Sequence, residues 1–179
     1  MKKTSLIFTL FLLLASSAFS QLARPNRPTL SLNADKGFIT INEFNAGYGL
    51  GSRTIPYSKK FFGFTSVNGY QVDEQFMVGA GTGVLIYEDG ALVPLFIDMR
   101  IRILTDQIAP YISGAGGLLL NVKDFNAGTM MFINPSAGVR YTLNRNFGVT
   151  LSAGLWMQMD PSIGRSSFIN VRMGGVYKF

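Results

Sequence analysis

An alternation of apolar with polar or small side chains, at a period of two residues, continues from Gly37 to the last residue, Phe179. It is clearest from Val93 to Ile103, where branched and unbranched apolar residues occupy every second position and charged residues such as Asp98 lie between them. Successive side chains of a β-strand point to opposite faces, so this period predicts strands with one apolar face. No segment shows the 3.6-residue period of an amphipathic helix. The sequence therefore predicts an all-β chain.

Turn signals divide this region into eight predicted strands. Glu88-Asp89-Gly90, the segment 105–107 and Asn144-Arg145-Asn146 favour tight turns, because Gly, Asn and Asp adopt the backbone conformations that such turns need. The expected strands are 38–50, 61–72, 76–87, 93–103, 108–121, 133–143, 147–158 and 166–179. The second has the least regular alternation, and we expect its Phe62, Phe64, Tyr70 and Val72 to face outward. Pro94, Pro110 and Pro135 lie inside three of the strands, where a proline removes a ladder hydrogen bond.

Alternation alone fits both a membrane barrel and a soluble barrel of the lipocalin kind, which would turn its apolar face inward. The composition of the polar face separates them, because a water-facing sheet would be rich in Lys, Glu and Thr. Here the polar face carries mostly Gly, Ala, Ser and Asn, and charged residues make up only 15% of the chain, against about 25% in ordinary soluble domains. Small residues suit the narrow lumen of an eight-stranded barrel. The sequence therefore predicts an eight-stranded, antiparallel, up-and-down transmembrane β-barrel.

Aromatic residues near the predicted strand ends favour the same interpretation. We expect them to form the two interfacial girdles of a membrane barrel. They are Tyr48, Phe61, Tyr70, Phe76, Tyr87, Phe132, Tyr141, Phe147, Phe168, Tyr177 and Phe179. The last strand ends on the aromatic Phe179, as closing strands of such barrels do. Trp156 is interpreted as an inward or rim packing residue.

The N-terminus has the features of a secretory signal peptide. Lys2 and Lys3 precede an apolar run too short to span a bilayer as a helix, and Ala18-Phe19-Ser20 fits a cleavage site. Residues 1–20 are therefore predicted to be removed. Residues 21–36 contain two prolines and no periodicity, and we interpret them as an N-terminal extension in the periplasm. The barrel would then comprise residues 37–179.

An even strand number places both ends of the barrel's chain, at residues 37 and 179, on the periplasmic side. The connections 52–60, 88–90, 122–128 and 159–165 would then face outside, and the shorter turns 73–75, 105–107 and 144–146 the periplasm.

Three runs of residues resemble a known family. They are Val93-Pro94-Leu95-Phe96-Ile97-Asp98-Met99-Arg100; Ala109-Pro110-Tyr111-Ile112 with Gly114, Gly116 and Gly117; and Asn134-Pro135-Ser136-Ala137-Gly138-Val139-Arg140. These runs resemble the small outer-membrane β-barrel proteins of the Bacteroidota that are often labelled porin-family, which are similar in architecture to OmpA/OmpX-type barrels. The resemblance implies the bacterial outer membrane, insertion through the barrel-assembly machinery, and no particular activity.

Six charged residues on the polar face form the candidate site. They are Glu43, Asp98, Arg100, Arg102, Arg140 and Arg172. The first and last strands are neighbours in a closed barrel, so Glu43 and Arg172 can meet there. We expect a salt-bridge network that fills the lumen, because unpaired charges in a narrow interior are costly. The alternative is a narrow polar path for small solutes or ions, which the arginine excess would make anion-preferring.

Other function classes have weaker support in the sequence. The chain contains no His and no Cys, so it lacks the commonest general base and metal ligands, and we predict no catalysis, cofactor or metal. Asp160, Ser162, Glu88 and Asp89 are interpreted as loop residues. The basic residues are scattered, which does not favour nucleic acid.

Interaction at the outer rim is a further possibility. Its loops carry Arg53, Tyr57, Lys59, Lys60, Lys123 and Arg165. These residues could attract phosphorylated lipopolysaccharide, or could equally be ordinary solvated loop residues. The combined prediction is a monomeric outer-membrane barrel with a structural or interaction role.

Overall fold

The computed structural model describes residues 36–50, 59–88, 90–121, 129–160 and 164–179. The predicted signal peptide, residues 21–35 of the predicted extension, and Arg53, Tyr57, Asp89, Lys123 and Ser162 lie outside the described residues. Among the residues it describes, no helix is long and apolar enough to cross a membrane.

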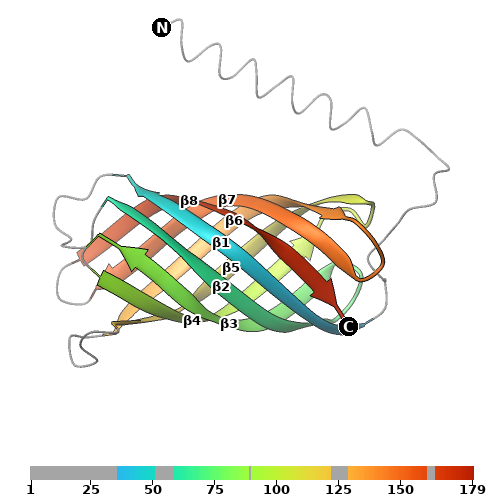
Figure 1. The fold of residues 1–179 in the computed structure, drawn as a ribbon, viewed down its shortest axis with the longest axis horizontal. Coiled ribbons are helices and arrows are strands. Elements are labelled where there is room, and N and C mark those ends of the chain that lie inside the picture. Colours follow the sequence, from blue (N-terminus) through green and yellow to red (C-terminus); the bar gives the residue numbers. More distant parts are fainter. Residues whose placement is uncertain (1–35, 51–58, 89, 122–128, 161–163) are drawn as a thin grey trace, which may run out of the picture.

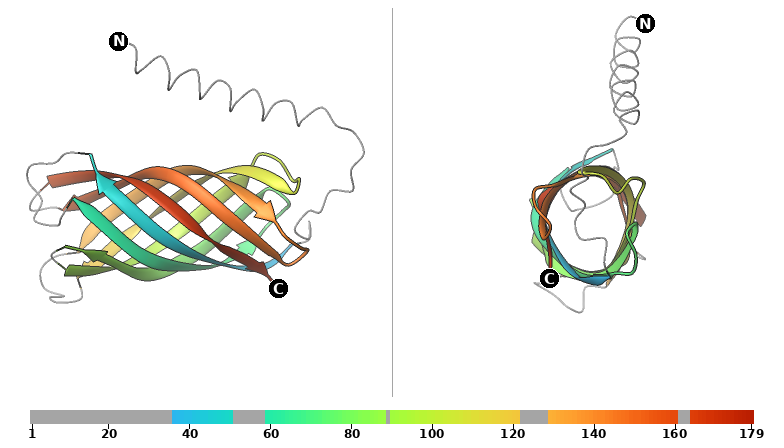
Figure 2. Two further views of the ribbon diagram at one scale, coloured as in Figure 1. Left: turned by 45° about the horizontal axis from the view of Figure 1, so that its top comes forward. Right: turned by 90° about the vertical axis from the view of Figure 1, so that its right-hand side faces the viewer.

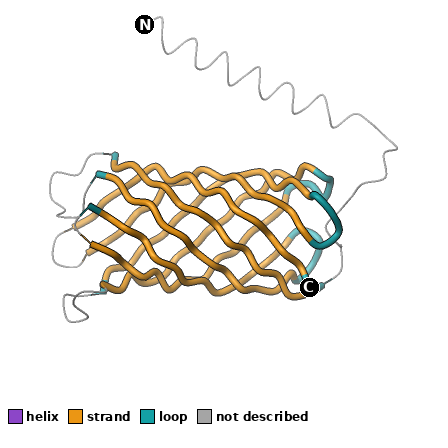
Figure 3. The backbone as a smooth tube through the Cα atoms, in the orientation of Figure 1, coloured by secondary structure: helices purple, strands orange, loops and turns teal. Residues whose placement is uncertain are grey.

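Eight antiparallel strands form one closed barrel in sequence order, with the last strand paired to the first (Figures 1 and 2). The strands are β1 (Gly37–Gly49), β2 (Lys60–Gln71), β3 (Phe76–Tyr87), β4 (Gly90–Arg102), β5 (Ile108–Asn121), β6 (Met130–Thr142), β7 (Phe147–Asp160) and β8 (Gly164–Lys178). Figure 3 shows the strands crossing the barrel at a steep tilt, with loops and turns at its two ends. The predicted fold class is confirmed.

The outer surface of the barrel is apolar and the inner surface carries the charges. On β4, Ile97 is 55% exposed whereas the neighbouring Asp98 is completely buried. Leu151 on β7 is 57% exposed and Ser152 beside it is buried. The outward positions predicted for β2 are also confirmed, because Phe62, Phe64, Tyr70 and Val72 are all exposed. A soluble barrel would show the reverse, so the surface is that of a membrane-spanning barrel.

The two ends of the barrel differ in what they carry. We call the end with Gly37 and Phe179 the terminal end, and the opposite one the loop end. At the terminal end the Oδ1 atom of Asp73 accepts hydrogen bonds from the backbone N–H groups of Phe76 (2.6 Å) and Gln75 (2.8 Å). These donors, that of Phe76 first, lower the pKa of Asp73 below its ordinary value. Asn144 closes a second turn in the same way, accepting from the backbone N–H groups of Asn146 and Phe147.

The last connection at the loop end is shorter than predicted. We expected a loop over 159–165, but Met159 pairs with Arg165 and Asp160 with Gly164 in the β7–β8 ladder. Gly164 permits the tight return because its φ is 115°, in the region that L residues with a side chain avoid.

All three prolines lie inside strands, and two of them interrupt a ladder on one side, whereas Pro110 is paired with Val139 in an unbroken ladder. Pro94 pairs with Leu119 of β5, but the β3–β4 ladder breaks between Leu95 and Leu92. The β6–β7 ladder likewise breaks between Ile133 and Ser136, around Pro135. This is the expected effect of a residue without an N–H donor.

The prediction for the aromatic girdles is wrong for four residues. Phe61, Tyr87, Phe132 and Phe168 are buried in the lumen, whereas Tyr48, Tyr70, Tyr141, Phe147, Tyr177 and Phe179 are exposed on the outer surface. Glycines on neighbouring strands leave room for inward rings, because Gly47 is paired with Phe61 and a Cβ added there would overlap the ring. The lumen is therefore filled by large rings as well as by small residues and charges.

Candidate functional site

The lumen divides into an aromatic layer towards the loop end, a central polar layer, and a layer with apolar and basic residues at the terminal end. The strand register produces these layers because alternate residues of every strand face inward. Each layer has its own chemistry, and the candidate site is the central one.

The aromatic layer consists of Phe61, Tyr87, Phe132, Trp156 and Phe168. Phe132 and Trp156 are stacked, with ring centroids 4.1 Å apart and planes at 12°. Phe61 lies 5.3 to 5.6 Å from the rings of Tyr87, Trp156 and Phe168. The Tyr87 hydroxyl donates to Oε1 of Gln158 at 3.1 Å. These rings are almost fully buried and pack across the lumen.

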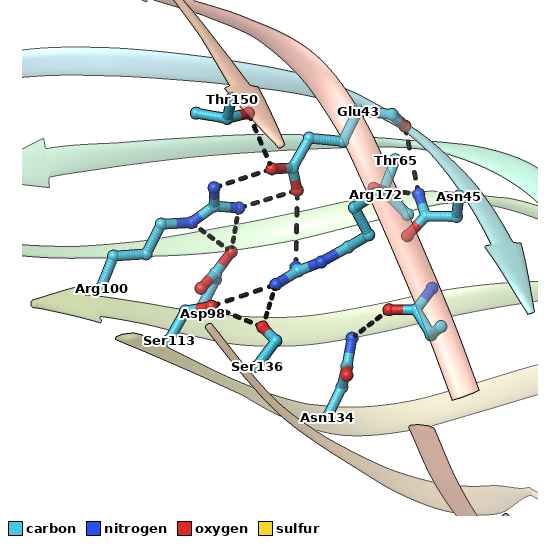
Figure 4. Close-up of polar contacts among 11 residues, drawn as sticks. Glu43, Asn45, Thr65, Asp98, Arg100, Ser113, Asn134, Ser136, Thr150 and Arg172 are labelled. Carbon is cyan, nitrogen blue, oxygen red and sulfur yellow. Dashed lines mark hydrogen bonds and ion pairs between the residues drawn. The ribbon is translucent and has the colours of Figure 1, made fainter. Parts of the chain in front are cut away.

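Glu43 on β1 is the centre of the polar layer (Figure 4). Arg100 on β4 donates to both carboxylate oxygens of Glu43, from Nη1 to Oε1 and from Nη2 to Oε2, each at 2.8 Å. Thr150 on β7 donates to Oε1 at 3.2 Å, and Nη1 of Arg172 on β8 lies 3.4 Å from Oε2. One carboxylate thus joins four strands, in the bidentate geometry that guanidinium and carboxylate groups favour.

Asp98 and two serines complete the connections of the arginines. Nε and Nη2 of Arg100 donate to Oδ2 of Asp98 at 3.0 and 2.6 Å. Nη2 of Arg172 donates to Oγ of Ser113 at 3.0 Å and to Oγ of Ser136. These two serine hydroxyls also lie 2.7 Å from each other. We call Glu43, Asp98, Arg100 and Arg172 the ion-pair network.

The other two predicted site residues face the lumen but do not join this network. Arg102 ends β4 at the terminal end and donates to the backbone carbonyl of Glu74. Arg140 on β6 is 2% exposed, its Nε has no hydrogen-bond partner, and no ion pair links it to a carboxylate of the described residues. The structure thus brings four of the six predicted residues together.

The chemistry available in the lumen is electrostatic. The part of the chain that the structure describes contains no group of three or more Cys, Asp or Glu residues placed to hold a metal ion. Each carboxylate of the network accepts from at least one arginine and is thereby held in a fixed position, although Oδ1 of Asp98 has no hydrogen-bond partner. Such an arrangement fixes β1, β4 and β8 relative to one another across the lumen.

The burial of Trp156 confirms its expected inward position, but sequence reasoning missed the other four rings of the aromatic layer, although a signal was available. Phe168 has the same parity as Asn170 and Arg172, and Phe61 the same parity as Thr65, so the alternation itself assigns these rings to the lumen.

Comparisons with known proteins agree with this architecture. Neither a family model nor a curated protein matches the chain. Among solved structures, the neisserial surface protein A has a TM-score of 0.59 with 15% identity, covering 81% of this chain and 99% of its own. The outer membrane protein OprG from Pseudomonas aeruginosa has a TM-score of 0.52 with 11% identity, covering 85% and 99%. A de novo designed transmembrane β-barrel has a TM-score of 0.53 with 16% identity, covering 82% and 99%. The chain thus has the fold of the small eight-stranded outer-membrane barrels.

Proposed function

We propose that this protein is a bacterial outer-membrane barrel with a structural or interaction role, whose lumen is closed and carries no catalysis. The observation that supports it most is the packing of side chains across the lumen in two successive layers. Large rings pack across it near the loop end, and the ion-pair network spans it below them. Passage of a solute would require breaking buried, charge-assisted hydrogen bonds, each worth about 1.5–3 kcal/mol.

The proposed location is the outer membrane, with the terminal end in the periplasm. The apolar outer surface supports it, since exposed Leu, Ile and Met would be costly in water and are favourable against lipid. The resemblance of the three sequence runs supports a more specific origin, among the porin-family-labelled barrels of the Bacteroidota. We propose the barrel-assembly machinery, membrane lipid and lipopolysaccharide as its partners and a monomer as its working form.

Single-channel conductance in planar lipid bilayers tests the closed lumen. We expect no reproducible openings from the wild-type protein. Refolded protein should be confirmed in the bilayer independently, by its resistance to unfolding in SDS at room temperature. Reproducible openings in such preparations would contradict the closed lumen.

A narrow channel for small solutes or ions is the second candidate, and the excess of arginine in the lumen favours it. If the barrel conducts, we expect anions to be preferred and the openings to disappear in Arg140→Ala or Asp98→Ala. The enzyme class has its own test, in which purified protein is incubated with lipid A or phospholipid. Chemical turnover of either lipid would contradict the proposal of a non-catalytic barrel.

A further inference from the structure

Four even-numbered strands each place one long polar side chain in the lumen near the terminal end. They are Gln71 on β2, Arg102 on β4, Arg140 on β6 and Lys178 on β8, each at most 4% exposed. Gln71, Arg102 and Lys178 are the last residues of their strands, and Arg140 lies two residues before the end of β6. This layer is separate from the ion-pair network and faces the proposed periplasmic side.

The buried charges of the described residues do not balance. Glu43 and Asp98 are the buried carboxylates, against the four buried arginines Arg100, Arg102, Arg140 and Arg172. The ion pairs of both carboxylates are with Arg100 and Arg172. Arg140 therefore has no ion pair of its own in the described part of the barrel. Because an arginine side chain keeps its proton in proteins, its positive charge stays in the lumen.

Tyr111 and Gln71 also have hydrogen-bonding atoms without partners in this layer of the lumen. Tyr111 on β5 is paired with Gly138, and the hydroxyl end of its ring lies over that glycine, two residues from Arg140 on the same face. The Tyr111 hydroxyl has no partner, and neither amide atom of Gln71 has one. The charges of Arg102 and Arg100 act on Arg140 unfavourably, and the charge of Glu43, already paired with Arg100 and Arg172, acts in the opposite sense. Cations and unused donors thus converge at this end of the lumen.

We propose that this end of the lumen binds a small inorganic anion of the size of chloride, held by the Arg140 guanidinium with the Tyr111 hydroxyl and the Gln71 amide as further donors. A buried arginine without a counter-charge is costly, and unpaired buried donors add to that cost. A bound anion removes both costs at once. Water alone would satisfy the donors but would leave the charge uncompensated.

Anion-specific stabilisation of the barrel is the direct test. Refolded protein in phospholipid vesicles is unfolded with urea in sodium chloride or in sodium gluconate, a much larger anion, at equal ionic strength so that screening is constant. We expect saturable stabilisation by chloride only, with the unfolding equilibrium constant falling about 100-fold at a chloride concentration 100 times the dissociation constant.

Matched variants assign the effect to the lumen. Arg140→Met should lose the chloride dependence and, in gluconate, should be at least as stable as the wild type, because it removes an uncompensated charge. Tyr111→Phe should raise the chloride concentration needed for half of the effect. Arg165→Met, which removes an exposed arginine at the loop end, should keep the full dependence. Equal stability of the wild type in both salts, or a dependence that survives Arg140→Met, would overturn the proposal.

Bromide crystallography decides the question if Arg140→Met does not refold. Crystals of the wild-type protein grown in sodium bromide should show an anomalous peak within hydrogen-bond distance of the Arg140 guanidinium. Bromide found only on the exterior, or water alone beside Arg140, would refute the site. This experiment is independent of the conductance measurement. A missing bromide peak would refute the anion site without affecting the proposal of a closed lumen, and channel openings would contradict the closed lumen without affecting the anion site.

Discussion

Replacing Glu43 with alanine tests the central claim that the polar layer holds the barrel together. The substitution removes the acceptor of two 2.8 Å bonds from Arg100, the bond from Thr150 and the ion pair with Arg172. Arg172 would then have no ion pair, and Arg100 would keep only the one with Asp98. Removing one partner of a buried ion pair costs about 3–5 kcal/mol, mostly because the remaining charge loses its compensation. We therefore expect Glu43→Ala to lower the free energy of unfolding by about 3–5 kcal/mol.

Urea unfolding in vesicles measures this loss. Trp156 is the sole tryptophan in the sequence and is stacked on Phe132 inside the lumen, so its fluorescence reports the opening of the barrel. A double-mutant cycle with Arg100→Ala isolates the pairwise term, for which we expect a coupling energy of about 1–3 kcal/mol. Asp106→Ala, an exposed carboxylate in a turn, serves as control and should change stability by less than about 0.5 kcal/mol. A loss below about 1 kcal/mol for Glu43→Ala would mean that the layer is screened by water, and the argument for a closed lumen would fail.

Three further perturbations have defined expectations. The folded-state pKa of Asp73 lies below its ordinary value of 3.8, so its carboxylate stabilises the turn above that pH, and this stabilisation is lost as pH falls through the folded pKa. Acid titration of the free energy of unfolding should show this loss, and Asp73→Asn should abolish it. The turn at Asn144, which an uncharged amide closes, should contribute no such pH dependence. Gly81→Val should destabilise the barrel by about 1–3 kcal/mol in urea titrations, since its side chain would enter an aromatic ring in the lumen, whereas Gly114→Ala, with open space around it, should be neutral. Leu151→Arg should cost about 2–4 kcal/mol in vesicles if this residue faces the middle of the bilayer, and a neutral result would contradict the orientation.

The strands and their faces were predictable because a barrel strand has only two faces. On β4 the alternation from Val93 to Arg102 assigned every side chain correctly, since a shift of one residue would expose Asp98 and Arg100 to lipid. The aromatic rings of the lumen were missed for a different reason. Their position near strand ends indicates the outer girdles, whereas the parity that Phe168 shares with Arg172 indicates the lumen. The structure shows that parity is the more reliable of these two signals.

The partners within the lumen were only partly predictable. The contact of Glu43 with Arg172 follows from the pairing of the first and last strands, and the structure has it at 3.4 Å. The shorter contact, 2.8 Å to Arg100, crosses the lumen from β4. It depends on the stagger of the strands around the barrel, which sets both the diameter and which inward residues share a level. One sequence does not determine that stagger.

The pairing of β1 with β8 has a consequence for how the chain acquires its structure. Ile39 pairs with Lys178 and Gly49 with Phe168. The first strand to be synthesised, β1, therefore keeps an edge without hydrogen-bond partners until the last strand, β8, pairs with it. Glu43 and Arg172, 129 residues apart, can form their ion pair only when that seam shuts. Closure of the barrel and formation of the Glu43–Arg172 ion pair are therefore coupled, and an intermediate that lacks the last strand would lack both.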